Sequence, residues 1–189
     1  MTRSSPPPVR VLFIGPTSAV WETIASEVEA DLARLTRDGV EIAYRCTGEG
    51  PLEIRSEADA RAAAPFVARI AIDAATDGFD AVIVDCTADP GVADARGAVD
   101  IPVIGAGEAL RSAMARAPQP VCMLTGDELR SITASALVAR AGGVATVAFG
   151  GTGFSHLVDV LIDACPGIVV LDPLAVALDA AIGACGVRP

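Results

Sequence analysis

The chain is poor in several features that mark particular classes of protein. Aromatic residues make up only 4% of its 189 residues, although hydrophobic residues make up 52%. Lysine and arginine together number 14, against 24 acidic residues, so the formal net charge is −10. Because nucleic acids and anionic membrane surfaces are bound through cationic patches, this charge argues against both as partners and favours a small molecule. A core of Ala, Val, Leu and Ile is typical of an α/β sheet under Ala-rich helices.

Targeting and membrane-spanning signals are also lacking. Residues 1–8 are polar and proline-rich, without the apolar segment of a signal peptide, and they predict a short disordered tail. The longest apolar stretch, 167–187, contains Asp172, Pro173 and Asp179. It therefore predicts a strand and a helix instead of a membrane span. We expect a cytoplasmic protein.

Cysteine is present, but without the short paired spacing of a zinc site or the context of a disulfide framework. Cys86 is the most informative of the five, because it ends an apolar run, and Asp89-Pro90 just after it predicts the cap and first residue of a helix. A thiol facing a helix N-terminus is expected to favour the thiolate, whereas the alternative is a small apolar residue ending a core strand. The five are Cys46, Cys86, Cys122, Cys165 and Cys185.

Apolar runs alternate with helical patterns and predict an α/β fold with parallel strands and right-handed crossovers. Strands are expected at 9–15, 40–46, 101–105, 119–125, 144–150 and 168–171, with one more ending at residue 86. Helices are expected at about 18–37 (capped by Thr17-Ser18), 56–77, 90–99, 108–115, 127–140, 154–164 and 173–184. We predict a tail at 1–8, a first α/β half at 9–117 that carries Cys86, and a shorter second half at 118–189.

A weak internal repeat relates the two halves. Aligning residues 82–87 with 147–152 by their threonines leaves each segment followed, about fifteen residues later, by another strand. In this register Gly151 takes the position of Cys86. Chance similarity between two βαβ units is the competing explanation.

Several motifs together resemble the Asp/Glu/hydantoin racemase superfamily, most closely its hydantoin racemase branch. The region around Cys86, FDAVIVDCTADPG at 79–91, is followed by IPVIG at 101–105 and GEA at 107–109. The turn FIGPTS at 13–18 resembles that branch's turn after the first strand. FGGTG at 149–153 and VVLDP at 169–173 resemble its second-cysteine region and closing strand.

The resemblance implies two pseudosymmetric α/β halves facing each other, and proton transfer next to a carboxylate or amide carbonyl without a cofactor or metal. In the family one cysteine removes the α-proton and a second delivers a proton to the opposite face. By this match Cys86 is the catalytic thiol. The small-molecule carboxylate or cyclic amide would be held by residues from both halves: Thr17, Ser18, Thr87, Ala88, Gly151, Thr152 and Gly153. The resemblance also implies a homodimer.

The sequence departs from the family at the expected second cysteine, where it has Gly151. The second half is shorter by about one βα unit, and the turn at 15–18 lacks both asparagines of the branch. Asp85 precedes the cysteine, and strand alternation predicts that its side chain points away from Cys86. Cys46 and His156 are possible second acids, although a core or surface role is the simpler expectation for each.

Three functions therefore remain open. The first is a racemase or isomerase that uses Cys86 and an unidentified second acid. The second is a one-thiol decarboxylase similar to arylmalonate decarboxylase, although that branch keeps the second-half cysteine and this chain keeps the first; covalent cis–trans isomerisation, as in maleate isomerase, is a further possibility. The third is a catalytically degenerate member that binds a small carboxylate or a protein partner. The fold cannot choose among these.

Overall fold

The computed structural model describes residues 7–19 and 21–186, and it alternates strands and helices along this part of the chain. Residues 1–6 of the predicted tail lie outside the described residues, and residues 7 and 8 are exposed. The elements are β1 (Val9–Gly15), α1 (Trp21–Leu35), β2 (Val40–Cys46), α2 (Glu57–Thr76), β3 (Ala81–Val84), α3 (Val92–Ala98), β4 (Val103–Gly105), α4 (Ala106–Arg116), β5 (Val121–Thr125), α5 (Gly126–Ser131), α6 (Ala134–Ala141), β6 (Thr146–Gly150), α7 (Ser155–Ala164), β7 (Val169–Leu171) and α8 (Pro173–Ala184).

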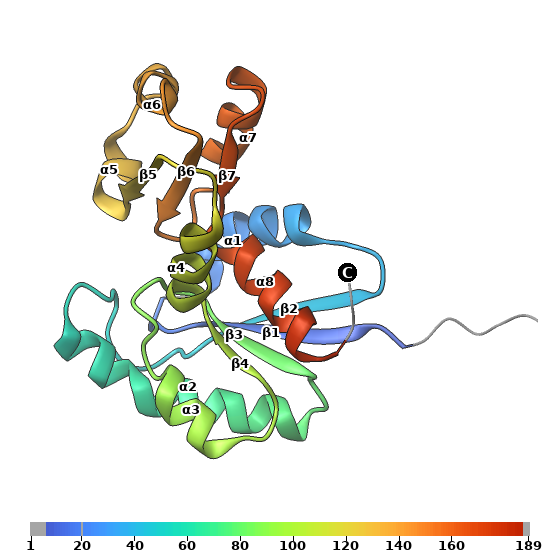
Figure 1. The fold of residues 1–189 in the computed structure, drawn as a ribbon. Coiled ribbons are helices and arrows are strands. Elements are labelled where there is room, and N and C mark those ends of the chain that lie inside the picture. The colour runs from blue at the N-terminus through green and yellow to red at the C-terminus, as the bar shows by residue number, and fades with distance from the viewer. Residues whose placement is uncertain (1–6, 20, 187–189) are drawn as a thin grey trace, which may run out of the picture.

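The strands form two parallel sheets that lie in separate lobes (Figure 1). The larger sheet has the order β2-β1-β3-β4, and the smaller has the order β5-β6-β7. Helices α1, α4 and α8 lie between the lobes (Figure 1). The predicted α/β fold with two parallel-sheet halves is therefore confirmed, with three strands in the second sheet.

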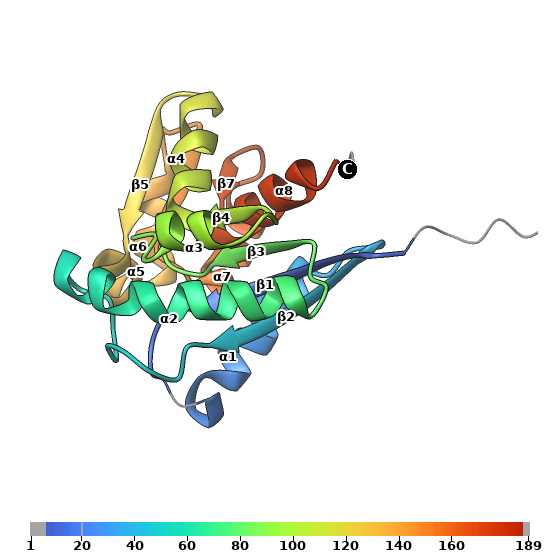
Figure 2. The same cartoon turned by 90° about the horizontal axis from the view of Figure 1, so that it is seen from below.

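Both faces of the central strands β1 and β3 are buried, as their apolar runs predict. In β1, Val11 and Phe13 pack with α8, whereas Leu12 and Ile14 pack on the other face. The same alternation runs through β3. Figure 2 views the sheet from the side that α2 and α3 cover. Central strands buried in this way give a fixed platform for the loops at their carboxyl ends.

Helices α4 and α8 join the lobes. Ala106 at the start of α4 belongs to the core of the larger sheet, and Leu110 one turn later packs with Ala148 and Leu171 of the smaller sheet. The α8 residue Leu178 is fully buried against the larger sheet. The C-terminal helix thus returns to the first lobe, and the division at 117/118 stays a prediction.

Three local expectations were wrong. The helix predicted at 127–140 is two helices, because Thr133 accepts a hydrogen bond from the Ala136 amide and caps α6 separately. The first helix begins at Trp21 instead of next to the expected Thr17-Ser18 cap, since the Ser18 amide donates to the Pro51 carbonyl (2.9 Å). Strand β3 ends at Val84, two residues before Cys86.

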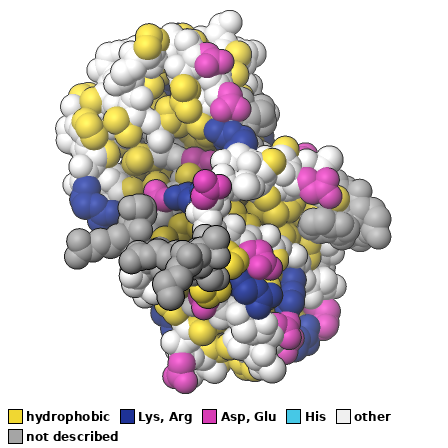
Figure 3. Space-filling model, turned by 90° about the vertical axis from the view of Figure 1, so that its right-hand side faces the viewer, with side chains coloured by type: hydrophobic (Ala, Val, Ile, Leu, Met, Phe, Trp, Pro, Cys, Tyr) yellow, Lys and Arg dark blue, Asp and Glu magenta, His cyan; other side chains and the backbone are white. Residues whose placement is uncertain are grey.

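Within the described residues, no helix combines the length and apolar character needed to cross a membrane. On the face drawn in Figure 3, acidic and arginine side chains are interspersed instead of being gathered by sign. This distribution gives that face no broad cationic footprint of the kind that binds nucleic acid.

Candidate active site

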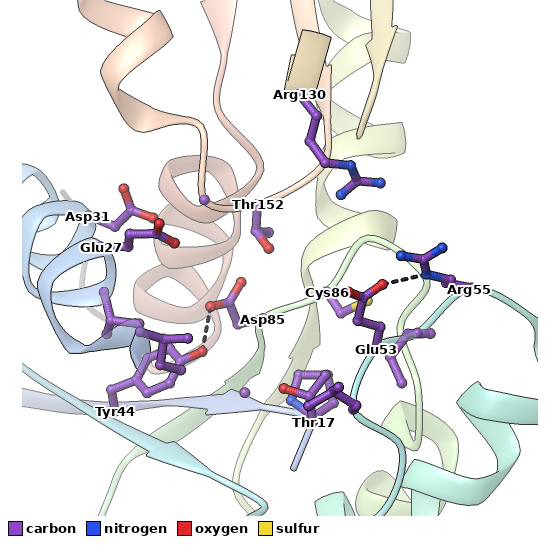
Figure 4. A pocket seen from close by; sticks show the side chains of 17 residues that line it. Thr17, Glu27, Asp31, Tyr44, Glu53, Arg55, Asp85, Cys86, Arg130 and Thr152 are labelled. Atoms are coloured by element: carbon purple, nitrogen blue, oxygen red, sulfur yellow. Dashed lines mark hydrogen bonds and ion pairs between the residues drawn. The ribbon is translucent and has the colours of Figure 1, made fainter. Parts of the chain in front are cut away.

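A cavity of about 400 Å³ opens between the lobes, at the carboxyl ends of β1 and β3. Parallel α/β sheets bind ligands at this edge. Figure 4 shows the side chains that point into it. The lining residues come from both lobes and include Thr17, Glu27, Asp31, Tyr44, Glu53, Arg55, Asp85, Cys86, Arg130, Thr152 and Gly153.

Cys86 is half-buried in the turn after β3 and lines this cavity. Burial raises the pKa of its thiol to about 11, and the charges of Asp85 and Asp89 add to the rise against a hydrogen bond from the Ala88 amide. The expected thiolate at a helix N-terminus is therefore wrong. Helix α3 begins only at Val92, six residues after Cys86, and the amide that faces the sulfur belongs to Ala88 in the turn before it. At neutral pH Cys86 is a protonated thiol, suited to giving a proton away.

Asp89 caps a different helix from the one the sequence suggests. Its Oδ1 accepts from the Gly107 amide at the start of α4 (2.7 Å), and its Oδ2 pairs with Arg111 (2.8 Å). Asp89 itself has a positive φ of 53°, so the chain turns sharply here. The turn that carries Cys86 is thus held by a hydrogen bond and an ion pair to α4, and it does not form the start of α3.

Asp85 lines the same cavity as Cys86, although the two side chains leave the chain in different directions (Figure 4). Strand β3 itself ends at Val84. Asp85 Oδ2 accepts a hydrogen bond from the hydroxyl group of Tyr44 on β2 (3.0 Å). Gly15 makes room for this contact, since a Cβ there would overlap the Tyr44 hydroxyl group and lie 3.0 Å from Tyr44 Cζ.

Two arginines stand over the Cys86 side of the cavity (Figure 4). Arg55, in the loop before α2, pairs with Glu53, and Arg130 on α5 pairs with Asp127 (2.6 Å). Both guanidinium groups are largely exposed, so a ligand can reach them. Glu27 and Asp31 of α1 line the other side. The cavity therefore has one end with two arginines beside Glu53, and one end that is acidic.

The predicted anion-holding residues divide into two groups. Thr17, Thr152 and Gly153 line the cavity. The lining residues do not include Ser18, Thr87, Ala88 and Gly151. Ser18 and Thr87 instead form hydrogen bonds that connect the segments around the cavity. The Ala88 amide faces the Cys86 sulfur.

The loops after β3 and β6 meet directly. Thr87 Oγ1 donates to the Gly150 carbonyl (3.0 Å) and so joins the Cys86 turn to the second lobe. Next to it, a Cβ on Gly151 would lie 3.1 Å from Phe154 Cε2 and 3.2 Å from the Gly126 Cα. A side chain at this position requires its neighbours to move by a few tenths of an ångström.

We expect Thr87→Val to lower the free energy of unfolding by about 1 kcal/mol, because one interlobe hydrogen bond is lost and the Gly150 carbonyl loses its partner. Chemical denaturation measures the change. Thr36→Val removes a comparable bond to the Leu32 carbonyl (3.1 Å) within the exposed end of α1 and should cost less. Equal costs for the two variants would contradict a role for Thr87 in joining the lobes.

The structure brings one predicted second acid close to the cavity and leaves the side chain of the other undescribed. Cys46 ends β2 beside Gly15 but is not one of the lining residues, and burial raises the pKa of its thiol further from neutrality. His156 belongs to the first turn of α7, and its side chain is outside the described part of the structure. Both roles stay predictions.

Sequence reasoning missed Arg55, Arg130 and Tyr44 as site residues. They lie in a loop, on a short helix and within a strand, at places that no motif marks. Only Asp85 carried a signal, because it stands next to Cys86 in a strand that is otherwise apolar. Its significance depended on where β3 ends.

A model of the Asp/Glu/hydantoin racemase family matches residues 11–134 of the chain. This segment contains the turn at Thr17, the Cys86 region and both arginines of the cavity. Compared by sequence with curated proteins, the chain has no match.

Solved structures with the same fold come from several kinds of enzyme. Allantoin racemase from Klebsiella pneumoniae is 19% identical with a TM-score of 0.77, over 95% of this chain and 89% of that one. The maleate isomerase Iso from Pseudomonas putida is 13% identical with a TM-score of 0.65, over 95% and 93%. A liganded double mutant of arylmalonate decarboxylase is 14% identical with a TM-score of 0.62, over 95% of both chains. At these identities the likeness establishes the fold alone.

Proposed function

Because this chain belongs to the Asp/Glu/hydantoin racemase family, we propose that it is a cofactor-independent isomerase acting at a carbon next to a carboxylate or amide carbonyl. The observation that carries the proposal is the position of Cys86, whose thiol lines an interlobe cavity of about 400 Å³. A small molecule fits a cavity of this size. A homodimer stays a prediction.

The charges in the cavity suggest how such a substrate is held. Arg55 and Arg130 offer planar donors to a carboxylate or carbonyl oxygen at the end of the cavity where Cys86 lies. Charge that develops on this oxygen when the α-proton leaves is stabilised by the same groups. The hydroxyl groups of Thr17 and Thr152 are further donors from the two lobes.

The protonated state of Cys86 defines its part in the reaction. Because its pKa is raised to about 11, the Cys86 thiol is protonated in the resting enzyme. It therefore acts first as an acid that gives its proton to the carbanion-like intermediate. In the opposite direction the thiolate takes the α-proton, so one group serves one face of the substrate. An isomerase of this kind needs a second group for the other face.

A decarboxylase is the second candidate, and one observation favours it. The position of the family's second cysteine is occupied by Gly151, and decarboxylation needs only the protonation step that a single thiol provides. Carbon dioxide leaves from one carboxylate, and Cys86 protonates the remaining enediolate. A degenerate binding protein is the third possibility.

Proton exchange distinguishes the three functions. Candidate amino acids, hydantoins and malonates are incubated with the protein in deuterated water and followed by NMR. An isomerase incorporates deuterium at the α-carbon and forms the opposite enantiomer, whereas a decarboxylase releases carbon dioxide from malonates only. Absence of both reactions across the three compound classes would favour the binding protein and contradict our proposal.

We expect Arg130→Gln to raise KM about tenfold, with a smaller effect on kcat, because one charged hydrogen bond to the substrate carboxylate is lost at a solvent-accessible site. Steady-state kinetics on a substrate found by exchange measures the effect. Arg61→Gln on α2 is the matched control, since Arg61 pairs with Glu57 and is not among the described residues that line the cavity. An unchanged KM in Arg130→Gln would remove Arg130 from the substrate-binding group.

A further inference from the structure

Asp85 is a buried carboxyl group in the cavity, and neither substrate binding by the arginines nor proton transfer by Cys86 involves it. Its Oδ2 is held by the Tyr44 hydroxyl group. Its Oδ1 is shielded from solvent and accepts no hydrogen bond of normal geometry from the described residues, although the Thr152 side chain points toward Asp85 (Figure 4). A buried carboxylate oxygen without a partner is costly, and such groups are retained where chemistry needs them.

We propose that Asp85 is the second acid–base group of this site and works together with Cys86. The assignment rests on the proposed function. The two side chains leave the chain in different directions: Asp85 lies between Tyr44 and Thr152, whereas Cys86 lies on the side of Arg55 and Arg130 (Figure 4). A substrate anchored on the arginines therefore meets a thiol and a carboxylate from separate directions.

The proposed step conserves atoms and charge. The Asp85 carboxylate takes the α-proton, and the electron pair of the broken C–H bond stays on the substrate as an enolate. The enolate then takes the proton of the Cys86 thiol on its other face, which leaves a Cys86 thiolate and a protonated Asp85. The free enzyme is restored when Asp85 loses its proton to solvent and the thiolate gains one. The reverse reaction uses the same groups with exchanged roles.

The ionisation of Asp85 suits this use. Burial raises its pKa to about 6, while the nearby Thr152 side chain and the hydrogen bond from Tyr44 hold it lower than burial alone would. Asp85 is thus mostly ionised at neutral pH, yet a stronger base than an exposed aspartate. Burial and the Asp85 charge keep the Tyr44 phenol protonated by raising its pKa. The titratable and charged groups that face Asp85 are Tyr44, Asp31, Asp172 with its partner Arg34, Cys46 and Cys86.

The decisive experiment compares Asp85→Asn, Cys86→Ser and Asp163→Asn with the wild type. The measurement is deuterium incorporation from solvent into amino acids and hydantoins as a function of pH. We expect Asp85→Asn to lower the exchange rate about 10²-fold and to abolish the limb in which wild-type activity rises with pH through about 6. Asp163 is an exposed α7 residue, so Asp163→Asn should match the wild type.

Stability separates a catalytic role from a structural one. The folded-state pKa of Asp85 is about 6, above the ordinary 3.8, so the charged group opposes folding above pH 6 and the penalty disappears below about pH 4. Asp85→Asn should therefore melt at a higher temperature than the wild type at pH 8, and not at pH 4. Reduced activity in a more stable protein excludes misfolding as the cause.

Tyr44→Phe provides an independent variant. Loss of the hydrogen bond that lowers the Asp85 pKa should shift the acidic limb to higher pH while exchange continues. An unmoved limb, or an Asp85→Asn rate within about threefold of wild type while Cys86→Ser is inactive, would overturn the role of Asp85 and leave the proposed function standing. If the wild type exchanges none of the compounds, the proposed function fails, and the assignment of Asp85 fails with it.

Discussion

Replacing Cys86 with serine is expected to lower the rate of isomerisation or decarboxylation by at least about 10³-fold, because a positioned acid–base group contributes this much to proton transfer. A serine hydroxyl group has nearly the shape of the thiol but is a much weaker acid. The substrate should still bind, since the arginines and threonines of the cavity are unchanged. Formation of the opposite enantiomer or release of carbon dioxide measures the rate, and a ligand-induced shift in melting temperature measures binding.

Cys185→Ser is the matched control for this prediction. The Cys185 sulfur lies 3.5 Å from the Asp80 carbonyl, at the opposite end of β3 from Cys86. The same chemical change at this site should leave the rate unaltered. Full activity in Cys86→Ser would contradict a proton-transfer role for the thiol in each of the enzymatic functions considered above.

Replacing Gly107 with alanine is expected to have the largest effect on stability. An added Cβ would overlap the Thr87 carbonyl oxygen and lie 2.8 Å from both the Thr87 carbonyl carbon and Asp89 Oδ2. The turn that carries Cys86 would have to move, and the hydrogen bond from the Gly107 amide to Asp89 would be lost. We expect a loss of about 3 kcal/mol in unfolding free energy, from overpacking together with the missing helix cap.

The Gly107→Ala variant should also lose activity at temperatures where it is still folded, because Cys86 and Thr87 shift together. Thermal denaturation and exchange kinetics on the same sample test both effects. Gly97→Ala in α3 is the matched control: an added Cβ meets nothing there within 4 Å of the described residues, and alanine should stabilise the helix by about 0.5–1 kcal/mol. A Gly107→Ala variant as stable as Gly97→Ala would show that the Cys86 turn can move freely.

Much of the fold was predictable because its determinants are local. Apolar runs bounded by glycine, proline and capping residues predicted strands β1 and β2 at their observed bounds and the order of every described element except the division between α5 and α6. That division depends on Thr133, a single threonine that caps a new helix inside an amphipathic pattern. A threonine in an amphipathic pattern can either continue a helix or cap a new one, so the pattern alone does not decide between the two.

The site was less predictable, since it depends on contacts between residues far apart in the chain. The sequence indicated Cys86, and through the repeat it indicated the loop at 150–153 that faces it. It did not indicate Arg55 and Arg130, whose importance comes from where two connecting segments are placed over the cavity. The sequence predicted that Asp85 points away from Cys86, but it did not indicate that one cavity takes in both side chains.

The sequence by itself determined the family, the parallel α/β architecture and the thiol at the carboxyl end of a central strand, because strand patterns and motifs are properties of neighbouring residues. Only the tertiary structure decided the protonation state of that thiol and which side chains lie near it. Burial, a distance-dependent effect of the whole fold, keeps Cys86 protonated and raises the pKa of Asp85 beside it. The pairing of Asp85 with Tyr44, 41 positions apart, exists because β1 brings β2 and β3 to either side of itself.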